Sequence, residues 1–173
     1  MKNIIFHDEV KNLDELVDKI QSLKNPPTLN DVKIGVICFL FDKNNKLVLN
    51  RRGAGARDDV GKLQALGGSI NDNDQSFRDS MKRELIEEAG VDDVNISSFV
   101  GAIVDSKYDK NSMQMIDWII LAYIGDVGEK EPKNMEPERC IGFERFDIND
   151  VDYGELGETA ASFLDYIKNK GIR

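Results

Sequence analysis

Three glutamates lie close together near the middle of the chain, within the run "RELIEEAG": Glu84, Glu87 and Glu88. In a helix, at about 100° per residue, they would occupy an arc of about 100°. Glu84 and Glu88 would border an apolar stripe, where water is scarce and like charges repel strongly. The stripe consists of four residues at helical spacing: Phe77, Met81, Leu85 and Ala89. Carboxylates in that position need a cation, and hard oxygen ligands suit Mg²⁺ or Mn²⁺. The alternative is a solvated acidic face, although such a face should lie opposite the stripe.

Two glycines, Gly67 and Gly68, precede this segment and separate a short apolar stretch from a polar loop. Glycine lets the backbone approach a ligand closely, because it has no side chain. A glycine carbonyl could therefore complete the oxygen shell of a cation. An ordinary tight turn would explain the pair equally well.

The elements that must position these residues can be predicted from periodicity and from turn residues. Helices are predicted over 13–23, 76–89 and 155–171, with a break at 25–30, Ser76 as the N-cap and Gly90 as the stop of the central helix. Strands are predicted over 33–42, 47–52, 94–106, 113–126 and 140–148, and a further short strand ends at the two glycines. The strands 94–106 and 113–126 should be antiparallel, since only 107–112 joins them. This order predicts an α+β fold with a mixed sheet between helices.

The stretch "GG…QSFRDSMKRELIEEAGV" resembles the Nudix box, G-x5-E-x7-R-E-U-x-E-E-x-G-U, in which U is apolar. The second half matches at every fixed position: Arg83, Glu84, Leu85, Glu87, Glu88, Gly90 and Val91. The first half departs from the signature. Gln75 stands where the first glutamate is expected, and Ser69 stands where the glycine is expected, as if one residue were added after Gly68. The flanking stretches 36–68 and 134–151 also resemble the Nudix hydrolase superfamily (MutT-like). The likeness therefore runs from about residue 33 to the end.

The resemblance implies a Nudix-type α/β/α sandwich over 33–173, with 1–32 as an N-terminal helical appendage. It also implies a Mg²⁺-dependent hydrolase, with Mn²⁺ as the alternative metal, that cleaves a pyrophosphate bond in a nucleoside diphosphate linked to another group. If the roles of the matching Nudix-box positions apply here, the metal ligands would be Glu84, Glu87, Glu88 and the Gly67 carbonyl. Arg83 would orient these carboxylates by ion pairing, although it could also be a helix-surface partner of Glu87.

The general base and the substrate contacts are the open part of this prediction. In the family the base often comes from the loop before the last strand, where Glu138 is the first candidate and Glu136 the second; a solvated charged loop is the alternative. Gln75 cannot be a charged ligand, but its amide oxygen could orient Arg83. Three arginines near the predicted substrate loop are candidate phosphate contacts, with surface solubility as the competing explanation: Arg51, Arg52 and Arg57. Trp118 and Phe143 could stack on a base, although strand aromatics are more often core.

Composition narrows the function classes. The chain has 173 residues and a formal net charge of −9, which disfavours nucleic-acid binding through a basic surface. The sequence shows no apolar run long enough for a membrane span and no export signal, so we expect a cytoplasmic protein. In that reducing compartment Cys38 and Cys140 should be free thiols. The expected partner is a small nucleotide or nucleotide derivative; the oligomeric state stays open, with a homodimer as one candidate. A catalytically weak Nudix-fold binding or regulatory module is the main alternative, and an isopentenyl-diphosphate-type isomerase ranks last.

Overall fold

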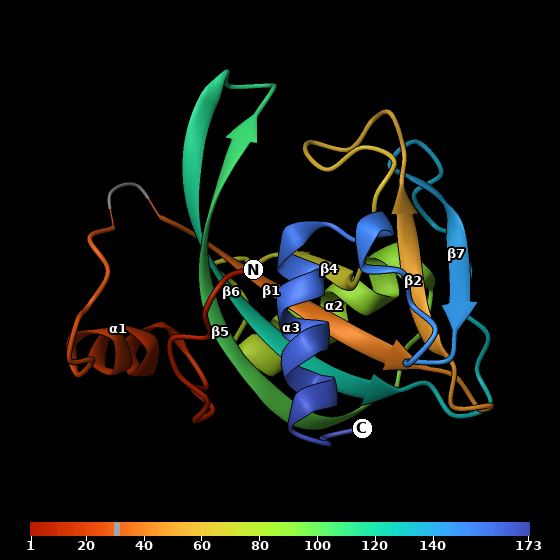
Figure 1. Cartoon of the computed structure of the whole chain (residues 1–173), viewed down its shortest axis with the longest axis horizontal. Coiled ribbons are helices and arrows are strands. Elements are labelled where there is room, and N and C mark those ends of the chain that lie inside the picture. The colour runs from red at the N-terminus through yellow and green to blue at the C-terminus, as the bar shows by residue number, and fades with distance from the viewer. Residues whose placement is uncertain (30–31) are drawn as a thin grey trace.

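The fold is built on one curled mixed β-sheet (Figure 1). The computed structural model describes residues 1–29 and 32–173, and the predicted break at 25–30 therefore ends on a residue outside the described part. Within that part the sheet has seven strands: β1 (Lys33–Phe41), β2 (Leu47–Arg52), β3 (Leu63–Gln64), β4 (Leu66–Ser69), β5 (Asn95–Asp109), β6 (Gln114–Asp126) and β7 (Cys140–Phe146). The order is β3-β2-β1-β6-β5, while β4 pairs with β1 and β7 with β2. Only β1 and β6 run parallel; the other pairs are antiparallel.

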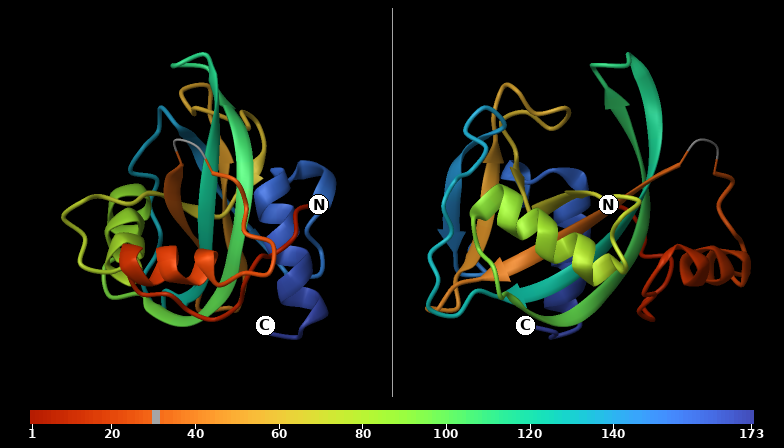
Figure 2. Two further views of the ribbon diagram at one scale, coloured as in Figure 1. Left: turned by 90° about the vertical axis from the view of Figure 1, so that its left-hand side faces the viewer. Right: turned by 180° about the vertical axis from the view of Figure 1, so that it is seen from behind.

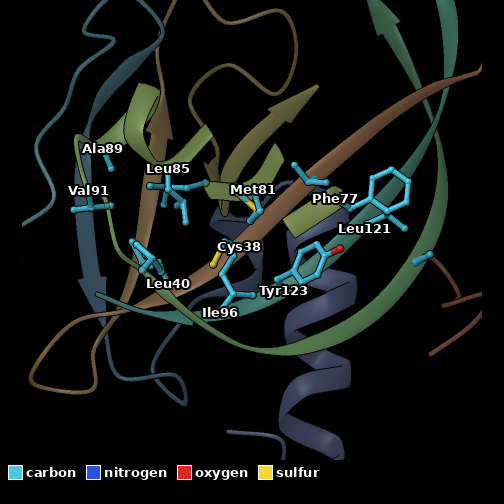
Figure 3. Packing of buried hydrophobic residues seen from close by; sticks show 14 of the residues in the cluster. Cys38, Leu40, Phe77, Met81, Leu85, Ala89, Val91, Ile96, Leu121 and Tyr123 are labelled. Carbon is cyan, nitrogen blue, oxygen red and sulfur yellow. The ribbon is translucent and has the colours of Figure 1, made fainter. Parts of the chain in front are cut away.

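Two helices cover opposite faces of the sheet, α2 (Phe77–Ala89) and α3 (Glu158–Asn169), as the left panel of Figure 2 shows. The alternation of side chains along each strand sends every second residue to one of two apolar layers. The layer under α2 contains Val36, Cys38 and Leu40 of β1, and Figure 3 shows its packing against Met81 and Leu85. The layer under α3 contains Phe39 and Phe41 of the same strand. The predicted sandwich of helices around a mixed sheet is confirmed.

The central helix begins and ends where the sequence predicts. The Ser76 side chain accepts a hydrogen bond from the Asp79 N–H, which satisfies one free donor of the first turn. Gly90 adopts the left-handed conformation, with φ of 63°, and closes the helix. The register of α2 against the sheet is therefore fixed at both ends, and the register decides which glutamates face inward.

Most predicted ends differ from the observed ones by one or two residues, and the differences that matter most for the fold lie at three places. The hairpin between β5 and β6 is longer, because 107–109 continue β5 and only 110–113 form the turn. β4 does not end at the glycine pair but passes through it, since Gly67 and Gly68 pair with Ile37 and Val36 of β1. The last helix starts at Glu158, because a short 3₁₀ turn, η1 (Tyr153–Glu155), precedes it.

The N-terminal segment packs onto the domain. Its helix, α1 (Leu13–Gln21), begins at Asn12, whose side chain accepts from the Glu15 N–H. Phe6, Val10 and Leu16 are buried in the apolar layer under α2. The Phe77 N–H donates to the Lys11 carbonyl at 2.8 Å, so this segment also holds the start of α2. None of the helices in the described part is both long and apolar enough to cross a bilayer.

Candidate active site

The acidic end of α2 faces the glycine pair of β4. Glu84 is buried, with 8% of its surface exposed, and an ideal Cβ added to Gly68 would lie 2.5 Å from its Oε2 atom. The Gly67 N–H donates a hydrogen bond to Glu88 Oε2 at 2.8 Å. Gly67 has φ of 153° and packs on the β1 backbone, which leaves no room for a Cβ. Glu87 points outward and is exposed. Both glycines thus make room: Gly67 for the neighbouring strand, and Gly68 for the Glu84 carboxylate.

The surroundings of the two inward-facing carboxylates disfavour their charged forms. Burial raises the pKa of Glu88 to about 8, and the nearby charges of Glu84 and Glu136 push it in the same direction. Burial also raises the pKa of Glu84, although the Arg83 guanidinium opposes that shift. A bound cation would relieve this cost, as the sequence argument expected for carboxylates at the core edge.

The donor set suits a hard divalent cation, because it consists of carboxylates beside a backbone cradle. The carboxylates do not converge in this arrangement. No three acidic, histidine or cysteine side chains of residues 1–29 and 32–173 form a ready-made metal group. Arg83 already engages two of these carboxylates, because its Nη1 atom lies 2.8 Å from Glu84 Oε1 and 3.3 Å from the Glu87 carboxylate. The ligand types and their burial fit a divalent metal. A metal bound there would contact carboxylates that Arg83 also contacts.

Arg83 is itself held from the preceding loop by Asp74. Its Nη2 and Nε atoms donate to Asp74 at 2.9 and 3.1 Å, and Nη2 also donates to the Ser69 carbonyl at 2.9 Å. The Arg83 side chain lowers the pKa of Asp74 to about 2, helped by the Asn71 N–H and the Ser80 hydroxyl. Gln75, which we predicted to orient Arg83, is exposed, and the neighbouring aspartate makes this contact instead.

A cleft of about 410 Å³ opens beside Glu88 and Gly67. Its lining includes four basic side chains and three acidic ones: Lys33, Arg52, Arg57, Arg139, Glu88, Asp109 and Glu136. The tip of the β5–β6 hairpin and the loop between β2 and β3 rise at the same end of the molecule (Figure 1), and Lys110 Nζ donates to the Ala54 carbonyl between them at 3.0 Å. This volume is within the range of small-molecule sites, and the mixture of charges suits a polyanion that shares a cation with the protein.

A family model described as the NUDIX domain matches residues 31–167. The chain belongs to the Nudix family. Among solved structures it resembles the MutT protein from Methanosarcina mazei Go1, with a TM-score of 0.65 and 17% identity, over 85% of this chain and 100% of that chain. It also resembles the NUDIX domain of Shewanella oneidensis NrtR complexed with ADP ribose, with a TM-score of 0.63 and 14% identity, over 89% and 97% of the two chains. At these identities the likeness establishes the fold, and the family match supports the predicted enzyme class, a Nudix pyrophosphohydrolase.

The three arginines proposed for phosphate binding separate within the Nudix fold. Arg52 lies on the α2 side of β2 and lines the cleft, held by the Asp58 carbonyl and carboxylate at 2.8 Å each. Arg57 also lines the cleft, and its guanidinium lies 4.2 Å from the centre of the Trp118 ring. Arg51 points to the other face, because side chains alternate along a strand, and it is paired with Glu144 and Glu155. Arg51 therefore does not reach the cleft.

The two candidate bases also separate. Glu136 lines the cleft, and its charge raises the pKa of both Glu84 and Glu88. Glu138 is exposed, and its main-chain carbonyl accepts from the Gly55 N–H at 3.0 Å. The loop is fastened to the end of α2, since the Met135 N–H donates to the Glu88 carbonyl at 3.1 Å. This attachment brings Glu136, rather than Glu138, next to the acids of the Nudix helix.

Several cleft residues were not found from the sequence: Lys33, Asn50, Asp109 and Arg139. The sequence does contain one indication for Asn50. It lies two residues before Arg52, so its side chain must lie on the same face of β2. The predicted thiols Cys38 and Cys140 are both free and buried, and Trp118 is buried at 4% exposure, as expected for a core aromatic. Phe143 is half-buried and lines the cleft.

Proposed function

We propose that this Nudix protein hydrolyses the pyrophosphate bond of a nucleoside diphosphate linked to another group, in a Mg²⁺-dependent reaction. The observation that supports it best is the pair Glu84 and Glu88, whose charges are disfavoured by burial. Glu88 lines the cleft, which also holds four basic side chains. A buried carboxylate beside a second, partly buried one is costly, and a bound cation would offset that cost.

Each residue then has a role in the reaction. Glu84, Glu87 and Glu88 hold the metal, with the Gly67 carbonyl as a further ligand. A metal bound there supplies charge screening of the pyrophosphate and a more acidic water. Arg83 keeps the carboxylates oriented, while Arg52, Arg57 and Arg139 bind phosphate oxygens. Glu136 accepts the proton of the attacking water, because it is the carboxylate of the 128–139 loop that lines the cleft.

A second candidate is a nucleotide-binding or regulatory module without turnover. It is favoured by one observation: the described residues contain no ready-made group of three metal ligands, while Arg83 is hydrogen-bonded to Glu84. The similar NrtR domain was crystallised with ADP ribose, so the same ligand class should be tested for binding as well as for cleavage.

One assay separates the two candidates. Phosphate release after coupling to a phosphatase is measured with Mg²⁺ over nucleoside triphosphates, oxidised nucleotides, ADP-ribose, nucleotide sugars and dinucleoside polyphosphates. We expect turnover of at least one substrate class, and a loss of most of that activity in Glu88→Gln. Tight binding of one compound without any turnover would favour the regulatory module instead, and an unchanged rate in Glu88→Gln would refute the metal assignment.

The base is tested by a matched pair of variants in the same loop. We expect Glu136→Gln to lower kcat by a factor on the order of 10² to 10⁴, the usual contribution of a positioned base. Glu138→Gln makes the same chemical change only two residues away and should leave kcat within about twofold. A loss confined to Glu138→Gln would transfer the role to that residue.

A further inference from the structure

One buried polar group in the cleft has no hydrogen-bond partner among residues 1–29 and 32–173. Asn50 is 5% exposed, and its Oδ1 atom makes no hydrogen bond to any of the described residues. Two other buried polar atoms share this property, Trp118 Nε1 and Tyr123 Oη, but both lie in the apolar layers. Of the three, Asn50 is the one that lines the 410 Å³ cleft. An unpaired buried amide is costly, so a ligand that satisfies it gains affinity.

The neighbours of Asn50 indicate what that ligand offers. Asn50 lies directly opposite Phe143 in the antiparallel pair of β2 and β7, and both line the cleft. Side chains of such a pair have Cβ atoms about 5 Å apart on one face. A flat ring stacked on Phe143 would therefore present its edge to the Asn50 amide. The amide carries one donor and one acceptor side by side, whichever way it is turned.

The position along β2 relates this pair to the phosphate end of the cleft. Arg52 lies two residues beyond Asn50, about 7 Å along the strand. Arg52 lines the cleft together with Gly67 and Glu88, so this end of the face adjoins the acidic end of α2. A ligand with an aromatic ring at Asn50 and phosphates at Arg52 has the order of parts found in a nucleotide.

We propose that Asn50 and Phe143 form the nucleobase subsite, and that the Asn50 amide selects adenine by a bidentate hydrogen bond to its 6-amino group and the adjacent ring nitrogen. Asparagine pairs with adenine edges in this way, and aromatic side chains stack on any base. The assignment deepens the proposed function, on which it rests for the nucleotide as substrate. Asn50 determines specificity and takes no part in bond cleavage.

The test measures binding of two nucleoside monophosphates, which hold no pyrophosphate bond to cleave. Calorimetry compares AMP with purine riboside 5′-monophosphate, which lacks only the 6-amino group. We expect the protein to bind AMP about tenfold or more tightly, as for one good bidentate pair. In Asn50→Leu the ratio of the two affinities should fall to within about twofold. Phe143→Leu should weaken both ligands by a similar factor and keep the ratio.

The matched control is Asn111→Leu, because Asn111 lines the same cleft from the β5–β6 hairpin. It should retain the preference for AMP. Equal binding of the two monophosphates by the unmodified protein overturns the proposal, and so does a ratio that survives Asn50→Leu or is lost only in Asn111→Leu. If Asn50→Leu fails to fold, the ratio of the AMP and purine riboside 5′-monophosphate affinities of the unmodified protein still tests the proposal. Because no step requires turnover, an inactive protein that keeps the ratio would refute the hydrolase and support the subsite.

Discussion

Replacing Asp74 by asparagine should weaken the fold by an amount that depends on pH. The Asp74 carboxylate accepts hydrogen bonds from two atoms of Arg83, from the Ser80 hydroxyl at 2.7 Å and from the Asn71 N–H at 2.9 Å. These contacts lower its pKa from the ordinary value of 3.8 to about 2. Only 12% of the side chain is exposed, so water screens the Arg83 ion pair little. At about 1.4 kcal/mol per pKa unit, the charged form contributes about 2 kcal/mol to stability at neutral pH.

The sign of the pH dependence follows from the direction of the shift. A carboxylate with a lowered pKa in the folded state contributes its full stabilisation above 3.8, the pKa of the unfolded chain. That stabilisation is lost as the pH falls toward 2 and the group is protonated in both states. The assay is urea unfolding of the parent protein and of Asp74→Asn at pH 7 and pH 3. The two free energies of unfolding should differ by about 2 kcal/mol at pH 7 and by about half of that at pH 3.

Asp72→Asn is the matched control, because it makes the same change two residues away on an exposed side chain. Its unfolding free energy should stay within about 0.5 kcal/mol of the parent at both pH values. A loss in Asp74→Asn that is equal at pH 7 and pH 3 would mean that charge is not the cause. No loss at pH 7 would refute the role of Asp74 as the anchor of Arg83.

Three further outcomes are expected. Gly68→Ala should lower kcat by about tenfold or more at little cost in thermal stability, because the new Cβ would displace the Glu84 carboxylate rather than the backbone; a Mg²⁺ titration with a melting curve checks both. Arg52→Ala should raise KM by about tenfold. Arg51→Ala should leave KM unchanged and lower stability by about 1 kcal/mol, since Arg51 pairs with Glu144 and Glu155 outside the cleft. The reverse pattern would contradict the assignment of strand faces. Gln75→Glu should leave turnover within about twofold, because the side chain is exposed, and a large gain would place it at Arg83 after all.

Local sequence patterns predicted most of the elements because each pattern has a local physical cause. The central helix could be placed within one residue, since its apolar spacing, its Ser76 cap and the Gly90 stop act over a few positions. The inward position of Glu84 and Glu88 followed from the same helical geometry. The ends of the β5–β6 hairpin could not be placed as well, because 107–109 continue the strand by pairing with β6.

The assignment of individual side chains to the cleft needed more than local pattern. Arg51 and Arg52 have the same side chain and adjacent positions, and only the direction in which β2 faces separates a structural ion pair from a cleft residue. Glu136 and Glu138 lie in a loop without periodicity. Their difference arises from main-chain hydrogen bonds to α2 and to the 53–56 turn, which form only after the chain has folded.

The contact between Asp74 and Arg83 also changes where the extra residue of the Nudix box lies. The sequence comparison placed the addition after Gly68 and left Gln75 at the position of the first acid. Counted from Gly68, however, Asp74 stands six residues on, which is the spacing of the first acid in the signature, and it is Asp74 that binds the arginine. We therefore infer that the added residue is Gln75 itself, inserted between the acid and the Ser76 cap, where an exposed side chain can be accommodated without moving either. The acidic partner of Arg83 is thus retained as a shorter side chain, one position earlier in the loop.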